Sequence, residues 1–227
     1  MLKFTVDETP LTEEELLHHK VAVATVLGRP YYNITCALRH MELQFDSLSP
    51  EEAAVSNARV IITTQDEAGI VNTKGIVMID TELEKYPAIA KAKILRSIMA
   101  ERVIDDQLII GIDPGIRIGI SAIYLHHEIA SAVVESSPQD AIKQVAVMLG
   151  GIESRKKVVK IGDGNITMAS QIARMLKMKF NDGIRIEIVD EHGTSLPQNT
   201  DANRRGARDR SSARTIAFRS GRVFTLK

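Results

Sequence analysis

Acidic residues recur in the second half of the chain, at places where a strand is expected to end or a helix to begin. The stretch 108–121 reads LIIGIDPGIRIGIS, and in it Asp113 follows an apolar run typical of a buried strand. Corresponding places are taken by further carboxylates: Asp163, Asp190, Glu191 and Asp209. Carboxylate oxygens are the ligands that Mg²⁺ and Mn²⁺ prefer. The pattern therefore predicts an acidic cluster that could hold a divalent cation.

These acids can meet only if the elements that carry them bring the strand ends together. Apolar periodicity predicts strands over 108–113, 117–124, 128–135, 157–161 and 184–189, and helices over 138–149, 166–180 and 209–219. The resulting order, βββαβαβα, favours a mixed α/β sheet. If the first, fourth and fifth strands are parallel neighbours, their carboxyl ends share one edge, where sites form in such sheets.

The last helix should turn its acid toward that edge. Asp209, Ala213, Ile216 and Ser220 lie at i, i+4, i+7 and i+11, which places them on the helix face expected to pack against the sheet. Each acid alone has an ordinary explanation as a turn residue, a cap or a first-turn acid that suits the helix dipole. We favour a shared site because the acids recur in corresponding places.

Carboxylates forced together repel one another and would partly take up protons. A hard divalent cation removes this repulsion and keeps positions open for water and substrate phosphates. Two Mg²⁺ or Mn²⁺ ions about 4 Å apart can activate a water and stabilise the leaving oxygen in phosphodiester hydrolysis. We therefore expect two ions of Mg²⁺ or Mn²⁺ and a hydrolase that acts on phosphodiesters.

Four short motifs resemble, in order and spacing, those of the RNase H-like superfamily. Gly111-Ile-Asp-Pro-Gly115 is similar to the first motif of the Holliday-junction resolvase RuvC and of its relative YqgF. The other similar segments are Ile161-Gly-Asp-Gly-Asn165, Asp190-Glu-His-Gly-Thr-Ser195 and Asp209-Arg-Ser-Ser-Ala213 with Ile216-Ala217. The resemblance covers about 107–222 and implies an RNase H-like fold and nuclease activity.

The resemblance also implies Asp113 and Asp209 as metal ligands, with Glu191 as the third. RuvC carries its second acid as a glutamate within the fourth strand, whereas this chain has Asp163 after a glycine. Asp163, Asp190 and Glu191 therefore remain alternatives for completing the site. Junction resolvases of this type act as dimers, and a homodimer is expected here by that analogy alone.

Arginines are concentrated around the last acid of the pattern. The segment 204–222 holds seven of them: Arg204, Arg205, Arg208, Arg210, Arg214, Arg219 and Arg222. Arginine binds phosphate bidentately, so this segment predicts nucleic-acid contact, with a solvated charged face as the alternative. Aromatic residues make up 4% and tryptophan is absent, so contacts should be mainly with the backbone. Arg155-Lys156-Lys157 is interpreted as an ordinary charged loop.

Charge and hydropathy divide the chain into two parts. Residues 1–105 carry 11 basic and 16 acidic side chains, whereas residues 106–227 carry 18 basic and 13 acidic ones. We expect residues 1–105 to form a smaller α/β domain and residues 106–227 the RNase H-like domain. In the first part the pattern predicts a helix over 12–27, a short strand over 42–45, a helix from Ser49, strands over 60–63 and 76–79, and a helix over 87–99.

Three functions remain open on these grounds. The first is a metal-dependent nuclease acting on junction-like DNA or structured RNA, and the second is a non-catalytic nucleic-acid-binding or scaffold protein. A nucleotide-binding relative of the actin and sugar-kinase fold is disfavoured, because Ile116 and Arg117 stand where small hydroxyl residues would meet phosphate.

The single cysteine, Cys36, excludes an intrachain disulfide. With no apolar run near the ~20 residues of a membrane span and no signal-peptide core, we expect a cytoplasmic protein and no membrane partner.

Overall fold

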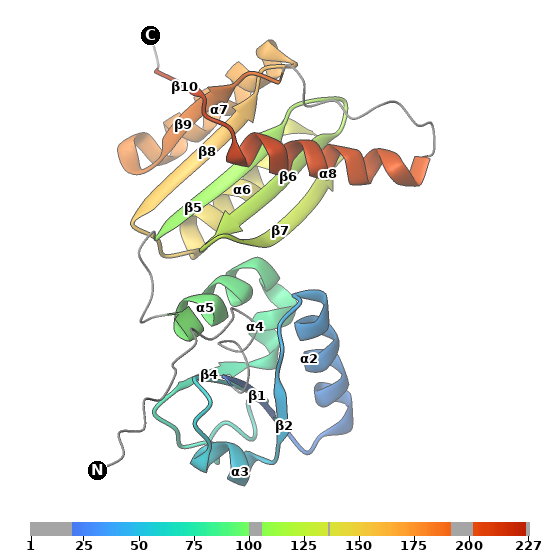
Figure 1. Ribbon diagram of the computed structural model, residues 1–227, viewed down its shortest axis with the longest axis vertical. Helices are drawn as coiled ribbons and strands as arrows, with labels where there is room; N and C mark the ends of the chain where they lie inside the picture. The colour runs from blue at the N-terminus through green and yellow to red at the C-terminus, as the bar shows by residue number, and fades with distance from the viewer. Residues whose placement is uncertain (1–19, 100–105, 136, 192–201, 226–227) are drawn as a thin grey trace, which may run out of the picture. The chain divides into compact units, whose positions relative to one another are not determined.

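The computed structural model describes residues 20–99, 106–135, 137–191 and 202–225, the first four residues of the last range by their backbone alone (Figure 1). The chain divides into two compact units, Met1–Pro87 and Ala88–Lys227. This division falls at the start of α5 (Pro87–Met99), ahead of the boundary expected between 105 and 106. Helix α5 joins the second unit because Lys91 Nζ donates to the Glu128 carbonyl oxygen, and Arg96 Nη1 to that of Glu153, each at 2.8 Å.

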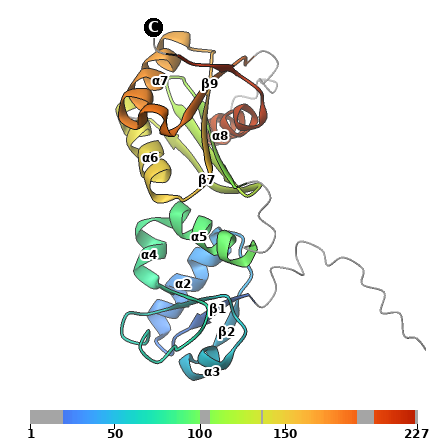
Figure 2. The ribbon, with the colours of Figure 1, turned by 90° about the vertical axis from the view of Figure 1, so that its left-hand side faces the viewer.

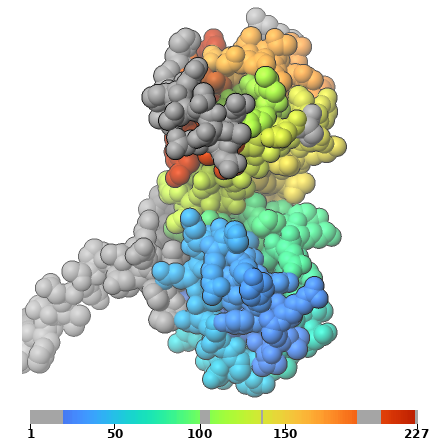
Figure 3. All heavy atoms as spheres, turned by 90° about the vertical axis from the view of Figure 1, so that its right-hand side faces the viewer, coloured from blue at the N-terminus to red at the C-terminus, as the bar shows by residue number. Residues whose placement is uncertain are grey.

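The first unit is a parallel sheet with helices on both of its faces (Figure 1). Its elements are β1 (Val21–Ala24), α2 (Gly28–His40), β2 (Asp46–Leu48), α3 (Pro50–Val55), β3 (Val60–Thr63), β4 (Ile76–Ile79) and α4 (Asp80–Lys85). The strand order is β2-β1-β3-β4, and the central strands β1 and β3 are buried throughout. Helix α3 begins with a capping box in which Ser49 and Glu52 bond each other's backbone N–H. Helix α2 forms part of the outer surface of this unit (Figure 3).

The helix expected over 12–27 is wrong where the structure describes it. Residues 12–19 lie outside the described residues, and Val21–Ala24 form the central strand β1. A four-residue apolar run fits a buried strand as well as a helix face, and burial on both faces of the sheet decides between them. Pro30 lies in the first turn of α2, where its missing N–H costs no hydrogen bond. The strand expected over 42–45 forms slightly later, as β2.

The second unit contains a mixed sheet with the expected order of elements. These are β5 (Gln107–Asp113), β6 (Ile118–Tyr124), β7 (His127–Val134), α6 (Pro138–Gly151), β8 (Lys156–Gly162), α7 (Ile166–Phe180), the 3₁₀ turn η1 (Asn181–Gly183), β9 (Arg185–Val189), α8 (Ala202–Phe218) and β10 (Arg222–Val223). The strand order is β10-β9-β8-β5-β6-β7. Strands β5, β8 and β9 run parallel, whereas β6, β7 and β10 pair antiparallel with their neighbours. The prediction of an α/β chain is thus confirmed.

Helix α8 packs on one face of this sheet, and α6 and α7 cover the other (Figure 2). Ala213, Ile216 and Ala217 are fully buried on the sheet side of α8. Gly111 in β5 permits the close approach, because a Cβ there would collide with the Ala213 carbonyl oxygen and with Ala217. The expected inner face of this helix is therefore confirmed, except that Ser220 lies beyond its end.

The start of α8 differs from the expectation. We expected a loop up to residue 208 and a helix from Asp209, but the helix already begins at Ala202. Arginine is a good helix former, and α8 continues through Gly206 at a modest cost. Asp209 therefore lies inside the helix, and its interpretation as a first-turn acid is wrong. Residues 193–201 of the expected loop lie outside the described residues.

Candidate functional site

The predicted acids lie at the carboxyl edge of β5, β8 and β9, which are adjacent and parallel. Asp113 is the last residue of β5, Asp163 follows β8, and Asp190 and Glu191 follow β9. Two hydrogen bonds tie the ends of β8 and β9 together. The Asp163 N–H donates to the Val189 carbonyl oxygen at 3.0 Å, and Asp163 Oδ1 accepts from the Glu191 N–H at 3.1 Å. Asp163 thus helps to fix the backbone of Glu191.

Two glycines make room for the Glu191 carboxylate at the end of β8. A Cβ on either Gly162 or Gly164 would run into that carboxylate, and one on Gly162 would also meet Ile216 of α8. The Gly164 N–H donates a hydrogen bond to the Glu191 carboxylate. The Glu191 side chain therefore lies over the strand end, between β8 and α8. Asp190, by contrast, is exposed, and its carbonyl oxygen accepts a hydrogen bond of 3.0 Å from Arg219 Nη1.

Helix α8 brings Asp209 to the same edge from the other side. Gly119 of β6 is the register partner of Asp113, and a Cβ on Gly119 would collide with the Asp209 carbonyl oxygen. The backbone of Asp209 thus lies directly over the strand next to Asp113. Its Oδ2 lies 3.0 Å from Arg117 Nη2, and Arg117 Nη1 lies 3.7 Å from Glu135 Oε1.

The carboxylates influence one another electrostatically. Burial, together with the negative charges of Glu191 and Asp209, raises the pKa of Asp113 to about 6, against a hydrogen bond from Ser212. Burial also raises the pKa of Glu191, against the Gly164 hydrogen bond and with a contribution from Asp163. The structure therefore brings Asp113, Glu191 and Asp209 within mutual influence, with Asp163 next to Glu191.

The donor set suits a hard divalent cation, since it consists of carboxylate oxygens whose charges oppose one another. Within the ranges that the structure describes, no group of three or more His, Cys, Asp or Glu side chains is arranged to hold a metal ion. The chemistry of the side chains thus fits the expected Mg²⁺ or Mn²⁺, whereas a ligating arrangement of three is not formed by these residues.

The arginines of α8 fall into different environments. Arg210 and Arg214 are exposed, and Arg214 Nη1 is 3.9 Å from Glu128 Oε2. Arg208 is partly buried, and the guanidinium of Arg219 is engaged with the Asp190 carbonyl. The side chains of Arg204 and Arg205 lie outside the described residues.

Sequence reasoning missed Arg117 and Ser212 as contacts of the acids. Arg117 lies four residues after Asp113, and Ser212 three residues after Asp209. Their proximity in sequence to the predicted acids was the available signal. Gly162 and Gly164 flank Asp163, and the space that they leave for the Glu191 carboxylate was also missed.

No family model matches this chain, and no curated protein matches it. Among solved structures, the chain is similar to a crystal structure of Aa-Ago with externally bound siRNA, with 12% sequence identity and a TM-score of 0.26. The alignment covers 75% of this chain and 34% of that chain, so this chain spans about a third of its length. A likeness at this level indicates no shared fold or activity. None of the described helices has the length and apolar character needed to cross a membrane.

Proposed function

We propose that the second unit is a divalent-metal-dependent nuclease of RNase H-like fold that hydrolyses phosphodiesters in structured nucleic acid, either junction-like DNA or folded RNA. The observation that carries the proposal is that Asp113, Glu191 and Asp209 meet at one edge of the sheet, where the pKa of Asp113 is accordingly raised. These acids come from three elements, β5, the end of β9 and α8. A fold that holds mutually repelling acids at one edge is typical of a site for a cation or a proton-transfer reaction.

The order of elements supports the fold assignment within this proposal. The strands and helices from β5 to α8 follow the βββαβαβα order that the resemblance implies, and their sheet is mixed. The four motifs of the resemblance fall on β5, after β8, after β9 and on α8. Each of them contributes an acid to the same edge of the sheet.

Asp113, Glu191 and Asp209 are the residues that would hold the cation. Bound there, the cation would activate a water and offset the charge of the scissile phosphate. Asp163 acts through the backbone of Glu191, which it holds by the 3.1 Å hydrogen bond, and is a positioning residue. The exposed Arg210 and Arg214 lie on the same helix as Asp209 and are suited to contact phosphates on either side of the scissile bond.

A cleavage assay tests this function. Labelled four-way junction, duplex and single-stranded DNA and RNA are incubated with Mn²⁺ or with EDTA. We expect cleavage of at least one substrate in Mn²⁺, none in EDTA, and a loss of at least about a hundredfold in Asp113→Asn. Asp66→Asn is the matched control, since Asp66 is an exposed acid of the first unit. Cleavage that survives in Asp113→Asn would contradict the assignment.

A second candidate is a nucleic-acid-binding protein without catalysis. It is favoured by Arg117, whose guanidinium lies 3.0 Å from Asp209 and already supplies a positive charge to the acidic cluster. A site of this kind can be stable without a metal ion. Tight binding of the same substrates with no cleavage in Mn²⁺ would support this candidate over the nuclease.

A further inference from the structure

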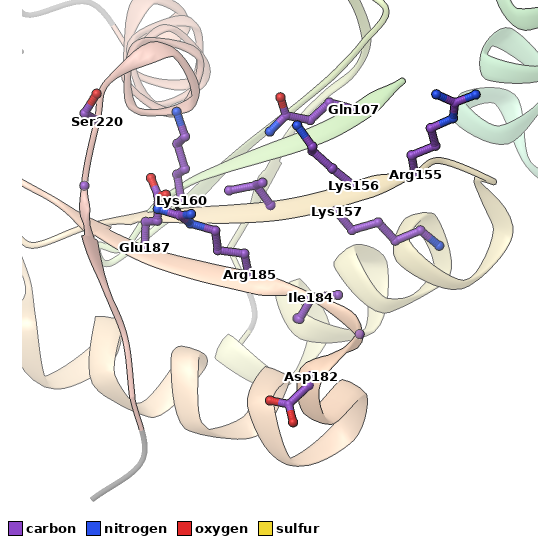
Figure 4. Close-up of a pocket in the computed structure, with 13 residues that line it drawn as sticks. Gln107, Arg155, Lys156, Lys157, Lys160, Asp182, Ile184, Arg185, Glu187 and Ser220 are labelled. Atoms are coloured by element: carbon purple, nitrogen blue, oxygen red, sulfur yellow. Dashed lines mark hydrogen bonds and ion pairs between the residues drawn. The ribbon is translucent and has the colours of Figure 1, made fainter. Parts of the chain in front are cut away.

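A hollow of about 580 Å³ opens on the sheet of the second unit, and its lining includes none of Asp113, Glu191 and Asp209 (Figure 4). Its floor is formed by β8 and β9, and Ser220 and Gly221, which follow α8, form one side. The sequence suggested an ordinary charged loop at Arg155-Lys156-Lys157. Lys156 and Lys157 instead belong to β8, and only Arg155 precedes the strand.

Because side chains alternate along β8, its lysines lie on two different faces of the sheet. Lys156 and Lys160 have the same parity and project from the same face of the sheet (Figure 4). Lys157 points to the other face, where its Nζ donates to the Leu149 carbonyl oxygen of α6 at 2.5 Å. On β9, Arg185 and Glu187 are the register partners of Val158 and Lys160. We call the surface formed by Arg155, Lys156, Lys160 and Arg185 the basic groove.

The basic groove has an excess of positive charge. Arg185 Nε pairs with Glu187 Oε1 at 2.7 Å, which offsets one cation. Asp182, at the far end, is paired with Lys177 of α7 at 2.7 Å, and Lys177 does not line the hollow. Burial lowers the pKa of Lys160, the carboxylate of Glu187 opposes this, and Arg185 makes a smaller contribution that lowers it. Lys160 and Arg185 thus lie near each other with Glu187 beside them, and the charges of Arg155 and Lys156 have no carboxylate among the lining residues next to them in sequence.

The cations are arranged along a line. From Lys156 to Lys160 strand β8 advances four residues, which is about 13 Å, and Arg155 directly precedes it. More than one phosphate of a nucleic-acid strand would lie along this length. A single phosphate or a mononucleotide would reach only part of the row. The spacing thus fits an extended polyanion.

One end of the groove adjoins the acidic edge. Lys160 Nζ donates to the Arg219 carbonyl oxygen at 2.7 Å, and the Arg219 guanidinium donates to the carbonyl oxygen of Asp190, the neighbour of Glu191. Lys160 of β8 precedes Asp163, which follows that strand, by three residues, about 10 Å of extended chain. A strand seated at the acids would cross the segment Arg219–Gly221 to enter the groove.

We propose that the basic groove binds the sugar–phosphate backbone of a nucleic-acid strand that extends from the acidic edge, a proposal that rests on the proposed function for the course of the strand. It adds a second contact surface to the arginines of α8. Because backbone contacts carry no sequence information, the groove contributes affinity and salt dependence but no base preference.

The test measures binding by the full chain in EDTA, so that no cleavage occurs. Fluorescence anisotropy of a labelled 30-nucleotide single strand and of a duplex is followed from 50 to 200 mM salt. We expect Arg155→Ala/Lys156→Ala to weaken binding about five- to tenfold and to reduce the salt slope by about 1.5. Arg174→Ala/Lys179→Ala removes the same charge from exposed positions of α7, on the opposite face of the sheet. It should change neither the affinity nor the salt slope. Circular dichroism confirms that both variants are folded.

The outcomes separate this proposal from the nuclease. An Arg155→Ala/Lys156→Ala variant with wild-type affinity and salt slope overturns the groove, whether or not the protein cleaves. An equal loss in the α7 variant also overturns it, since the effect would then follow net charge alone. Pyrophosphate that competes as well as the 30-nucleotide strand at equal phosphate concentration would indicate a small-anion site and overturn the extended strand. Reduced binding by the groove variant, with no cleavage by any protein, keeps the groove and removes the nuclease.

Discussion

Arg117 Nη2 lies 3.0 Å from Asp209 Oδ2, and this ion pair joins the segment after β5 to helix α8. Both side chains are mostly buried, and Nη1 of the same guanidinium extends toward Glu135 at 3.7 Å. An internal cation therefore lies at the side of an acidic cluster in which Glu191 and Asp209 raise the pKa of Asp113. It offsets the charge of Asp209 and, in the proposed function, would compete with a divalent ion for that carboxylate.

Replacing Arg117 should separate these two effects. Arg117→Gln leaves a partly buried carboxylate without its ion pair, so we expect a loss of about 1–2 kcal/mol in the free energy of unfolding in EDTA. The removal of one positive charge should also tighten Mn²⁺ binding by about three- to tenfold. Urea denaturation and isothermal titration calorimetry measure the two quantities.

Arg214→Gln is the matched control for this prediction, because Arg214 is exposed and lies 3.9 Å from Glu128. It should change neither quantity appreciably. Weaker Mn²⁺ binding in Arg117→Gln would contradict the competition between the guanidinium and the ion. If neither wild type nor variant bound Mn²⁺, the metal-dependent function itself would be wrong.

Asp113 should make the stability of the second unit depend on pH. Its pKa is about 6 in the folded chain and near 3.8 in the unfolded chain, so protonated Asp113 favours the folded state. That contribution is complete below about pH 4 and is lost as the pH rises through 6. We expect Asp113→Asn, measured in EDTA, to be more stable than the wild type by about 1–2 kcal/mol at pH 8, with the difference vanishing toward pH 4.

Asp182→Asn should show the opposite dependence of stability on pH. Its pairing with Lys177 lowers the pKa of Asp182, so any stability that this acid contributes is present at neutral pH and lost on acidification. Thermal melts of both variants at several pH values give the comparison. A stability difference for Asp113→Asn that is the same at pH 4 and pH 8 would show that its acidic neighbours do not perturb it.

The sequence predicted an element correctly where its apolar pattern was compatible with only one kind of secondary structure. Alternating or continuous apolar runs predicted β5 to β9 closely, and the i, i+4, i+7 spacing identified the buried face of α8. It failed where tertiary burial decided, as at Val21–Ala24, whose apolar run continues a helical pattern but forms the central strand β1. It also failed at the start of α8, where polar residues suggested a loop.

The positions of the acids could be predicted from the strand ends, but the residues that surround them could not. That Asp113 and Asp163 would lie at one edge required only that β5 and β8 be parallel neighbours. The position of Glu191 depends on the space left by Gly162 and Gly164, and the pairing of Arg117 depends on where α8 crosses β6. Such contacts between distant segments have no periodic signature in the sequence. The same holds for the basic groove, since Lys160 and Arg185 become neighbours only through the pairing of β8 with β9.

The crossing of α8 over the sheet should be sensitive to one methyl group. A Cβ on Gly119 would collide with the Asp209 carbonyl oxygen, which is backbone and cannot move aside cheaply. We expect Gly119→Ala to lower the free energy of unfolding by about 2–3 kcal/mol and to displace Asp209 from the edge. Gly150→Ala is the control, since a Cβ there meets nothing within 4 Å and should stabilise α6 by up to about 1 kcal/mol. Urea denaturation distinguishes them, and a neutral Gly119→Ala would contradict the close packing of α8.

The exposed arginines of α8 should contribute to nucleic-acid binding independently of catalysis. Arg210 and Arg214 lie one turn apart on the helix that carries Asp209, and Arg214 is only loosely paired. In EDTA, we expect Arg210→Ala/Arg214→Ala to weaken binding of a labelled junction about five- to tenfold. The slope of log K against log salt concentration should fall by the amount expected for the loss of about two phosphate contacts. The α7 variant Arg174→Ala/Lys179→Ala serves as the charge-matched control. An unchanged slope for Arg210→Ala/Arg214→Ala would show that the outer face of α8 is merely solvated. A reduced slope would place the phosphate backbone beside Asp209, where the scissile bond of the proposed reaction must lie.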